Sequence, residues 1–301
     1  MNLEDIVISG TGVDLKTLSR GNPLTNQVQQ RLVDLTFLDP PVDGDFGPVS
    51  KLALQQFAKM VGLEVDLTLE PPVAQALLES DIDMLLPVTP RSDLAGRIFR
   101  YMRRKNYFFA RLPKYLNIVY VEGVAKSGVP NDDRENVFND RRIVLVIEDG
   151  RPVEKGNWTA TTEPGKDFTE RPMNPKGAAR IAFGQFKSWR VGVHNAGKPS
   201  RHEALVQVGN IRVHRDLNKD YKRTGDAVFE GSNFGVNQHH GFDRPEDNIG
   251  PASAGCLVGR SKTEHKEFMQ LIKTDPRLKA SQGYKYITTV IAGDDLHNAI
   301  S

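Results

Sequence analysis

The stretch that decides how this chain is interpreted is Ser-Ala-Gly-Cys-Leu-Val-Gly-Arg at residues 253–260, which holds the only cysteine among 301 residues. Without a second cysteine, Cys256 cannot form an intramolecular disulfide. A lone cysteine is often a small buried hydrophobic residue. Here Gly255 allows a sharp turn close to a ligand, and the small Ser253 and Ala254 leave room around the sulfur. These surroundings favour a thiolate nucleophile.

Two histidines precede the cysteine in the run Asn-Gln-His-His-Gly at residues 237–241. A histidine within hydrogen-bond reach can accept the proton of a thiol, which is only a few per cent ionised at neutral pH. Adjacent residues of a strand face opposite sides, so only one of the two imidazoles can face the sulfur. We expect His240 to be the base, with His239 as the alternative, because His240 directly precedes Gly241 and lies 16 positions before Cys256.

This combination resembles the L,D-transpeptidase (YkuD-like) family, in which a His-Gly step is followed less than about twenty residues later by Ser-x-Gly-Cys. Residues 142–150 and 158–165 resemble that family's opening hairpin and its loop of Thr, Pro and Gly, and the resemblance covers about residues 117–295. It implies a mainly-β catalytic domain whose thiolate attacks a peptide carbonyl to form a thioester. Release to an amine would be transpeptidation and release to water would be hydrolysis; the sequence leaves both open.

The resemblance and the residue types together predict roles for individual residues. The predicted catalytic group is Cys256, His240, His239, Ser253 and Gly255, and the predicted substrate-binding group is Arg180, Gly241, Ala254 and Arg260. Arg180 is included because a guanidinium can hold a substrate carboxylate through two hydrogen bonds. Backbone N–H groups of the turn at residues 254–256 are expected to stabilise an oxyanion. Asn237 or Gln238 would orient the imidazole as a third member. The chain departs from the family at Ala254, where the family has histidine, and at Val258, where it has arginine.

The N-terminal part carries an independent pattern. Apolar residues recur at helical spacing over residues 24–35, a turn signal follows at Asp43-Gly44, and Pro48 suits the start of a second helix. A third short helix is predicted over residues 73–80. Helix, Asp-Gly-x-Phe-Gly-Pro, helix resembles the small three-helix peptidoglycan-binding domain over about residues 20–80, which implies peptidoglycan as a partner.

The predicted fold class is therefore α+β with two domains: a small three-helix N-terminal bundle and a mainly-β, YkuD-like catalytic domain with flanking helices. The predicted boundaries are 1–80 for the peptidoglycan-binding domain, 81–116 for a basic helical linker and 117–301 for the catalytic domain. Residues 94–107 of the linker are expected to form a helix whose charged face is solvated and whose other face docks on its neighbour. With 39% hydrophobic and 26% charged residues, the composition is ordinary for a globular protein.

Partners and location follow from the same features. A net charge of +2 indicates no polyanion binder, so no nucleic-acid partner is expected, and no apolar run is long enough for stable membrane insertion. The first residues lack a basic start and an apolar core, so we expect synthesis in the cytoplasm without a signal peptide. Action at the cell wall would then follow phage-type release, as for an endolysin. The oligomeric state is open.

In the expected catalytic domain, short β-rich runs predict strands at 117–121, 142–148, 203–208, 211–214 and 284–291. Helices are predicted over 175–186 and over 262–273, the second with Ser261 as its N-cap and Glu264 in a capping box.

Two alternatives to a cysteine enzyme remain at this point. His194, His202 and His214 could join His239 and His240 in the zinc site of a wall hydrolase, although their spacing fits no metal template and no cofactor or metal is expected. The chain could also be a non-catalytic wall-binding virion protein, as the replaced histidine at Ala254 and the shifted Arg260 suggest.

Overall fold

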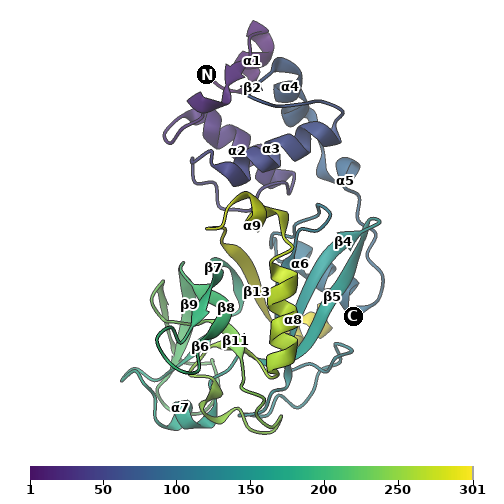
Figure 1. Cartoon of the computed structure of the whole chain (residues 1–301). Coiled ribbons are helices and arrows are strands. Elements are labelled where there is room, and N and C mark those ends of the chain that lie inside the picture. The colour runs from purple at the N-terminus through teal and green to yellow at the C-terminus, as the bar shows by residue number, and fades with distance from the viewer. Residues whose placement is uncertain (300–301) are drawn as a thin grey trace.

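The computed structural model describes residues 1–299 and has two parts, a helical N-terminal region and a large mainly-β region (Figure 1). The α+β class with a helical region first is thus confirmed. No helix in the described range has the length and apolar character needed to cross a membrane.

The helical region buries one apolar face of each helix in a shared core. Its elements are α1 (Leu3–Ser9), β1 (Val13–Asp14), η1 (Leu15–Thr17), α2 (Pro23–Asp34), α3 (Pro48–Met60), β2 (Thr68–Leu69), α4 (Pro71–Glu79) and α5 (Ile82–Leu85). Proline begins α2, α3 and α4, where its fixed φ favours the first turn and its missing N–H costs nothing. The three predicted helices are confirmed. Helix α1 was not predicted, and it begins with a capping box between Asn2 and Asp5.

The connector contacts both regions. Helix α6 (Leu94–Arg104), capped by Asp93, buries Ile98 and Phe99 in a core cluster shared with strand residues of the β region. The predicted helix with a docked face is therefore confirmed. Farther along, Leu112 and Tyr115 belong to the core of the helical region.

The β region is built on a closed barrel with strand order β11-β12-β5-β4-β3-β13-β7-β8, and a second sheet with order β10-β9-β6 lies beside it. The strands are β3 (Asn117–Glu122), β4 (Asp140–Glu148), β5 (Arg151–Thr161), β6 (Ala178–Ile181), β7 (Gly184–His194), β8 (His202–Gln207), β9 (Ile211–Asp216), β10 (Ala227–Gly231), β11 (Gln238–His240), β12 (Leu257–Gly259) and β13 (Tyr286–Ala292). The remaining helices are α7 (Lys166–Glu170), η2 (Gly250–Ala252), α8 (Lys262–Ile272), α9 (Pro276–Ala280) and α10 (Gly293–Asn298). Each of the five predicted strands is present, and β4 and β5 form a hairpin in the stretch for which one was predicted.

Helix α8 is also confirmed, with the Ser261 side chain accepting a hydrogen bond from the Glu264 N–H. The predicted capping box is only half formed, because the Glu264 carboxylate accepts no hydrogen bond from the Ser261 N–H. The helix predicted over residues 175–186 is wrong, because this segment forms β6 and the start of β7. β6 pairs with β9 and buries Ala179 and Ile181 in the core cluster of the barrel. Long-range pairing has overridden the helix preference of an alanine-rich run.

A buried ionic network joins the two regions. The Arg277 guanidinium, 2% exposed, donates to Asp39 at 2.6 Å and to Asp275 at 2.7 Å. Tyr284 donates to the second Asp39 oxygen, and the Lys187 ammonium donates to the Asp39 carbonyl at 3.2 Å. Asp39 belongs to the helical region and its partners to the β region, so the two parts share one satisfied buried charge cluster.

Candidate functional site

The cysteine lies at the end of a tight turn between η2 and β12. The Ser253 hydroxyl accepts a hydrogen bond from the Gly255 N–H at 3.1 Å and donates to the Cys256 carbonyl at 3.0 Å. Gly255 has φ +119°, and a Cβ there would lie 2.3 Å from the carbonyl oxygen of Ala179. The turn therefore requires glycine both for its backbone conformation and for the close approach of β6. Ser253 shapes this turn through backbone contacts and makes none with the sulfur.

The Cys256 thiol is buried and held by backbone groups. Its Sγ donates to the Gly235 carbonyl at 3.4 Å and accepts from the Asn237 N–H at 3.4 Å. Burial raises the pKa of the Cys256 thiol to about 11, and the bond from Asn237 offsets this only in part. The resting thiol is thus protonated at neutral pH.

A cavity of about 510 Å³ opens beside the sulfur. Cys256, Gly255 and Ala254 line it on one side, and His194 and His239 contribute the imidazoles. The rest of the lining is largely apolar: Phe168, Met173, Phe234, Val236, Phe242 and Pro251, with Asn195 and Lys198 near His194. The arrangement combines a nucleophilic atom, two imidazoles and largely apolar walls.

The hydrogen bonds of His239 fix which of its nitrogens is basic. Its Nδ1 lies 2.8 Å from the carbonyl oxygen of His240, which can only accept, so Nδ1 carries the proton. In the neutral imidazole Nε2 is then a free acceptor. Burial holds the pKa of His239 well below its usual range, so the ring is neutral at physiological pH.

His194 has the opposite tautomer. The Asn237 side-chain oxygen accepts from the Gln207 N–H at 2.9 Å, so its amide nitrogen is the group that donates to His194 Nδ1 at 3.0 Å. His194 Nε2 therefore carries the proton and is a donor. The two rings stack with centroids 3.9 Å apart. The imidazole that Asn237 orients is therefore that of His194. Burial lowers the pKa of His194 to about 4.

The geometry favours His239 over the predicted His240 as the histidine beside the cysteine. Both lie on β11, and their side chains face opposite sides of the sheet, so only His239 lines the cavity. His240 stacks on His202 at 3.6 Å, lies near Phe242, and accepts the Phe242 N–H on its Nδ1. Gln238 lies in the barrel interior and donates to Thr288, so it does not orient either ring.

Three of the predicted substrate-binding residues do not reach the cavity. Arg180 is 1% exposed and pairs with Glu163 and Asp216, so its guanidinium is neutralised inside the protein. Arg260 donates to the Arg244 carbonyl at 3.3 Å and supports the loop after β11. Gly241 lies against Phe138, where a Cβ would come within 2.8 Å of the ring. Of the predicted substrate-binding group, only Ala254 lines the cavity.

The histidines considered for zinc do not converge on one point. His194, His202, His239 and His240 stack in pairs, which brings ring faces together and not nitrogen lone pairs. His214 lies apart on β9. Over residues 1–299, no group of three or more His, Cys, Asp or Glu side chains is arranged to hold a metal ion.

Sequence reasoning named His194 only as a possible zinc ligand and missed the apolar cavity wall. His194 ends β7, 62 positions before Cys256, and reaches the cavity because β7, β8, β11 and β12 are successive barrel strands. No local motif predicts that His194 lines the cavity. The one signal in the sequence was Asn237, two positions before His239.

Comparison with known proteins identifies the helical region. Residues 22–77 match the family described as "Putative peptidoglycan binding domain", a match that ends before the barrel. No curated protein matches the chain. A solved structure described as a fused Zn-dependent amidase/peptidase/peptidoglycan-binding domain-containing protein from Clostridium acetobutylicum is 11% identical, with 93% of this chain and 99% of that chain covered and a TM-score of 0.28. A TM-score this low does not indicate a shared fold. The match over residues 22–77 confirms the resemblance to a peptidoglycan-binding domain and supports peptidoglycan as the partner of this chain.

Proposed function

We propose that the chain is a cysteine-dependent, L,D-transpeptidase-like (YkuD-like) enzyme that cleaves or transfers stem peptides of peptidoglycan. The observation that carries this proposal is the shared cavity of Cys256 and His239, in which the imidazole Nε2 is a free acceptor. The peptidoglycan-binding match supports the substrate class. Residues 1–80 would hold the polymer, 81–116 would connect, and 117–301 would carry the chemistry at the cell wall.

The reaction begins with a neutral pair, because burial raises the pKa of the thiol and lowers that of the imidazole. As the sulfur attacks the peptide carbonyl carbon, its proton passes to His239 Nε2 and a tetrahedral oxyanion forms. Collapse breaks the carbon–nitrogen bond, and the imidazolium returns the proton to the leaving amine. Water or an acceptor amine then attacks the thioester, gives its proton to His239, and releases the acyl group while the sulfur regains a proton.

The oxyanion needs donors that are not already engaged. Ser253 occupies the Gly255 N–H, so that group of the predicted turn is unsuited to this role. We assign the oxyanion to the Cys256 N–H and to His194 Nε2–H, the protonated nitrogen of a ring that lines the same cavity. His194 thereby supplies an imidazole from β7 in a chain that has Ala254 where the family has histidine.

A non-catalytic wall-binding protein is the second candidate. The observation in its favour is that both hydrogen bonds of Cys256 Sγ go to backbone groups, and within residues 1–299 no histidine bonds to the sulfur. Under this alternative the thiol is a packing group and the cavity holds a peptide without breaking it.

The two candidates are separated by mass spectrometry of peptidoglycan fragments incubated with the wild type and with Cys256→Ala, each with and without a chelator. The cysteine enzyme gives new products from the wild type alone, indifferent to chelator, whose masses identify water or an amine as acceptor. Products from both proteins would reject the thiolate and direct attention to a metal. No product from either, with binding retained, would favour the non-catalytic protein.

A further inference from the structure

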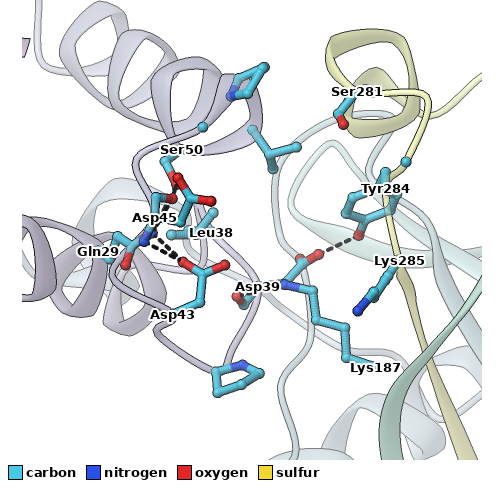
Figure 2. Close-up of a pocket in the computed structure, with 15 residues that line it drawn as sticks. Gln29, Leu38, Asp39, Asp43, Asp45, Ser50, Lys187, Ser281, Tyr284 and Lys285 are labelled. Atoms are coloured by element: carbon cyan, nitrogen blue, oxygen red, sulfur yellow. Dashed lines mark hydrogen bonds between the residues drawn. The ribbon is translucent and has the colours of Figure 1, made fainter. Parts of the chain in front are cut away.

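A second cavity, of about 350 Å³, lies between the helical region and the β region (Figure 2). It shares no lining residue with the cavity of Cys256. Its walls include Ser281 and Gly283, next to α9, which borders the helical region. The Cys256 cavity is lined instead by Phe168 of α7, at the far end of the β region (Figure 1). We call this second cavity the junction cleft.

The wall on the side of the helical region is a loop held rigidly by one amide. The buried side chain of Gln29 donates to Asp43, to the Asp45 carbonyl and to Ser50, and it accepts the Gly44 N–H at 2.8 Å. Both the oxygen and the nitrogen of this amide thus help to fix the loop. The carboxylates of Asp43 and Asp45 are held out on this wall (Figure 2).

The opposite wall carries positive charge. Lys187 and Lys285 line it, beside the buried Asp39 that Arg277 and Tyr284 bind (Figure 2). Lys187 is half-buried and its ammonium has one hydrogen-bond acceptor, the Asp39 carbonyl at 3.2 Å. Since an ammonium has three donors, two remain for a ligand or water.

The charges on the two walls do not satisfy each other. Within the described part of the chain, no ion pair links Asp43 or Asp45 to Lys187 or Lys285, and the side chains of Asp45 and Lys285 make no hydrogen bond. The Arg277–Asp39 pair and the Gln29 amide hold the backbone of the loop and the buried Asp39 in place, so the cleft between the charges is preformed. A preformed cleft with separated charges of opposite sign suits a ligand that has both signs itself.

We propose that the junction cleft is a second binding site, for a peptide segment that carries a free amine and a free carboxylate close together. The carboxylate would pair with Lys187 and Lys285, and the ammonium with Asp45 and Asp43. Resting on the proposed function, the occupant is the diamino acid of a stem peptide that is not cross-linked, whose side chain ends in both groups. The polymer would be held at this cleft while another stem peptide enters the Cys256 cavity at the far end of the barrel.

The test is calorimetric binding to the full chain carrying Cys256→Ala, so that no turnover occurs. The probe is alanyl-glutamyl-diaminopimelic acid, with two matched derivatives: one acetylated on the side-chain amine and one amidated on the side-chain carboxylate. Lys285→Glu and Asp45→Lys reverse one exposed charge on each wall. Lys16→Glu and Asp66→Lys make the same changes on exposed residues of the helical region outside the cleft.

We expect Lys285→Glu and Asp45→Lys each to weaken binding about fivefold, a loss that salt reduces, with little change in the two controls. The amidated probe should lose affinity in the parent but not further in Lys285→Glu, and the acetylated probe should do the same with Asp45→Lys. Equal binding by all four variants would overturn the proposal. Equally strong competition by a peptide-free disaccharide would overturn it too, by identifying a sugar as the occupant.

The outcome is independent of whether the enzyme proposal holds. Binding that depends on Lys285 and Asp45 supports the junction cleft even if no product forms in the mass-spectrometric experiment. Conversely, the wild type could cleave fragments while Lys285→Glu and Asp45→Lys bind the probe as tightly as the parent does. This result would support the enzyme proposal and reject the junction cleft as a binding site.

Discussion

The loop at residues 43–50 and the turn at residues 253–256 both present functional groups from a tight backbone, but they are built differently. Gln29, which fixes the first, lies on the preceding helix, so nearly all of its support is local. The second depends on Ala179 of β6 for its close packing and on Gly235 for the thiol hydrogen bond. A local turn keeps its shape wherever the helices form, whereas the cysteine turn requires the assembled barrel.

The electrostatics of the two sites also differ. The junction cleft holds exposed charges of both signs, which suits reversible binding in water. The Cys256 cavity holds groups that burial keeps neutral, a thiol with a raised pKa and imidazoles with lowered ones. Neutral acid–base partners in a largely apolar cavity suit proton transfer during a reaction. The difference supports the two proposals, in which the junction cleft holds the polymer and the Cys256 cavity carries out the bond chemistry.

The largest expected effect separates the two histidines of β11. His239→Ala removes the base in the Cys256 cavity and should lower kcat by about 10²- to 10⁴-fold. His240→Ala is the matched control, because it changes the adjacent ring on the other face of the strand, and we expect less than about tenfold loss. The rate of peptide release from soluble peptidoglycan fragments measures kcat for both variants. An equal or larger loss in His240→Ala would reverse the assignment.

The next effect concerns the ionic cluster that joins the regions. Arg277→Met leaves Asp39 and Asp275 buried without their cation, and we expect unfolding to become easier by about 3–5 kcal/mol. Lys273→Met removes an ion pair with Glu203 that is roughly half-exposed, and it should cost about 1 kcal/mol or less. Urea unfolding of both variants provides the comparison. Similar losses would mean that the buried cluster contributes no more than a surface pair.

A glycine in each turn gives the third comparison. Gly255→Ala forces a side chain into a positive-φ position against a backbone carbonyl, so we expect about 1–3 kcal/mol of destabilisation together with lost activity. Gly44→Ala has φ +70° but meets only the side chain of Asn26, so about 1 kcal/mol is expected, with activity on soluble fragments retained. Thermal unfolding and turnover of both variants test this. If Gly44→Ala were the more damaging, the cysteine turn would be the more adaptable of the two.

These comparisons also explain how far sequence reasoning reached. Helices α2, α3 and α4 could be predicted because proline, turn signals and apolar spacing are local properties. That Cys256 and a neighbouring histidine line one cavity could be predicted for the same reason. The choice between His239 and His240 could not, since it depends on which face of β11 meets the cavity. Neither could the cavity role of His194, which only barrel closure brings to the sulfur.

The segment at residues 175–186 illustrates the same limit. Its alanines favour a helix locally, but Ala179 packs within 3 Å of where a Gly255 side chain would begin, and β6 supplies the wall of the cysteine turn. Whether this segment forms a helix or a strand is decided by its contacts with β9 and with the cysteine turn. The spacing of residues in the sequence does not show these contacts. Arg180 was misassigned for the same reason, because Glu163 and Asp216 neutralise it only in the folded chain.

The last comparison needs no substitution, only a change of pH, and it tests the neutral character of the Cys256 cavity. The buried thiol has a pKa of about 11, so its thiolate fraction should rise about tenfold for each pH unit between 7 and 10. The rate of alkylation by iodoacetamide should follow this slope without a plateau, and Cys256→Ala should show no alkylation. An ion pair with His239 predicts a flat profile instead, because a thiolate already formed at neutral pH would react at a nearly constant rate over the same pH range. A plateau would therefore show that Cys256 and His239 already form an ion pair in the enzyme without substrate, so that proton transfer precedes substrate binding. The Cys256 cavity would then hold separated charges, as the junction cleft does.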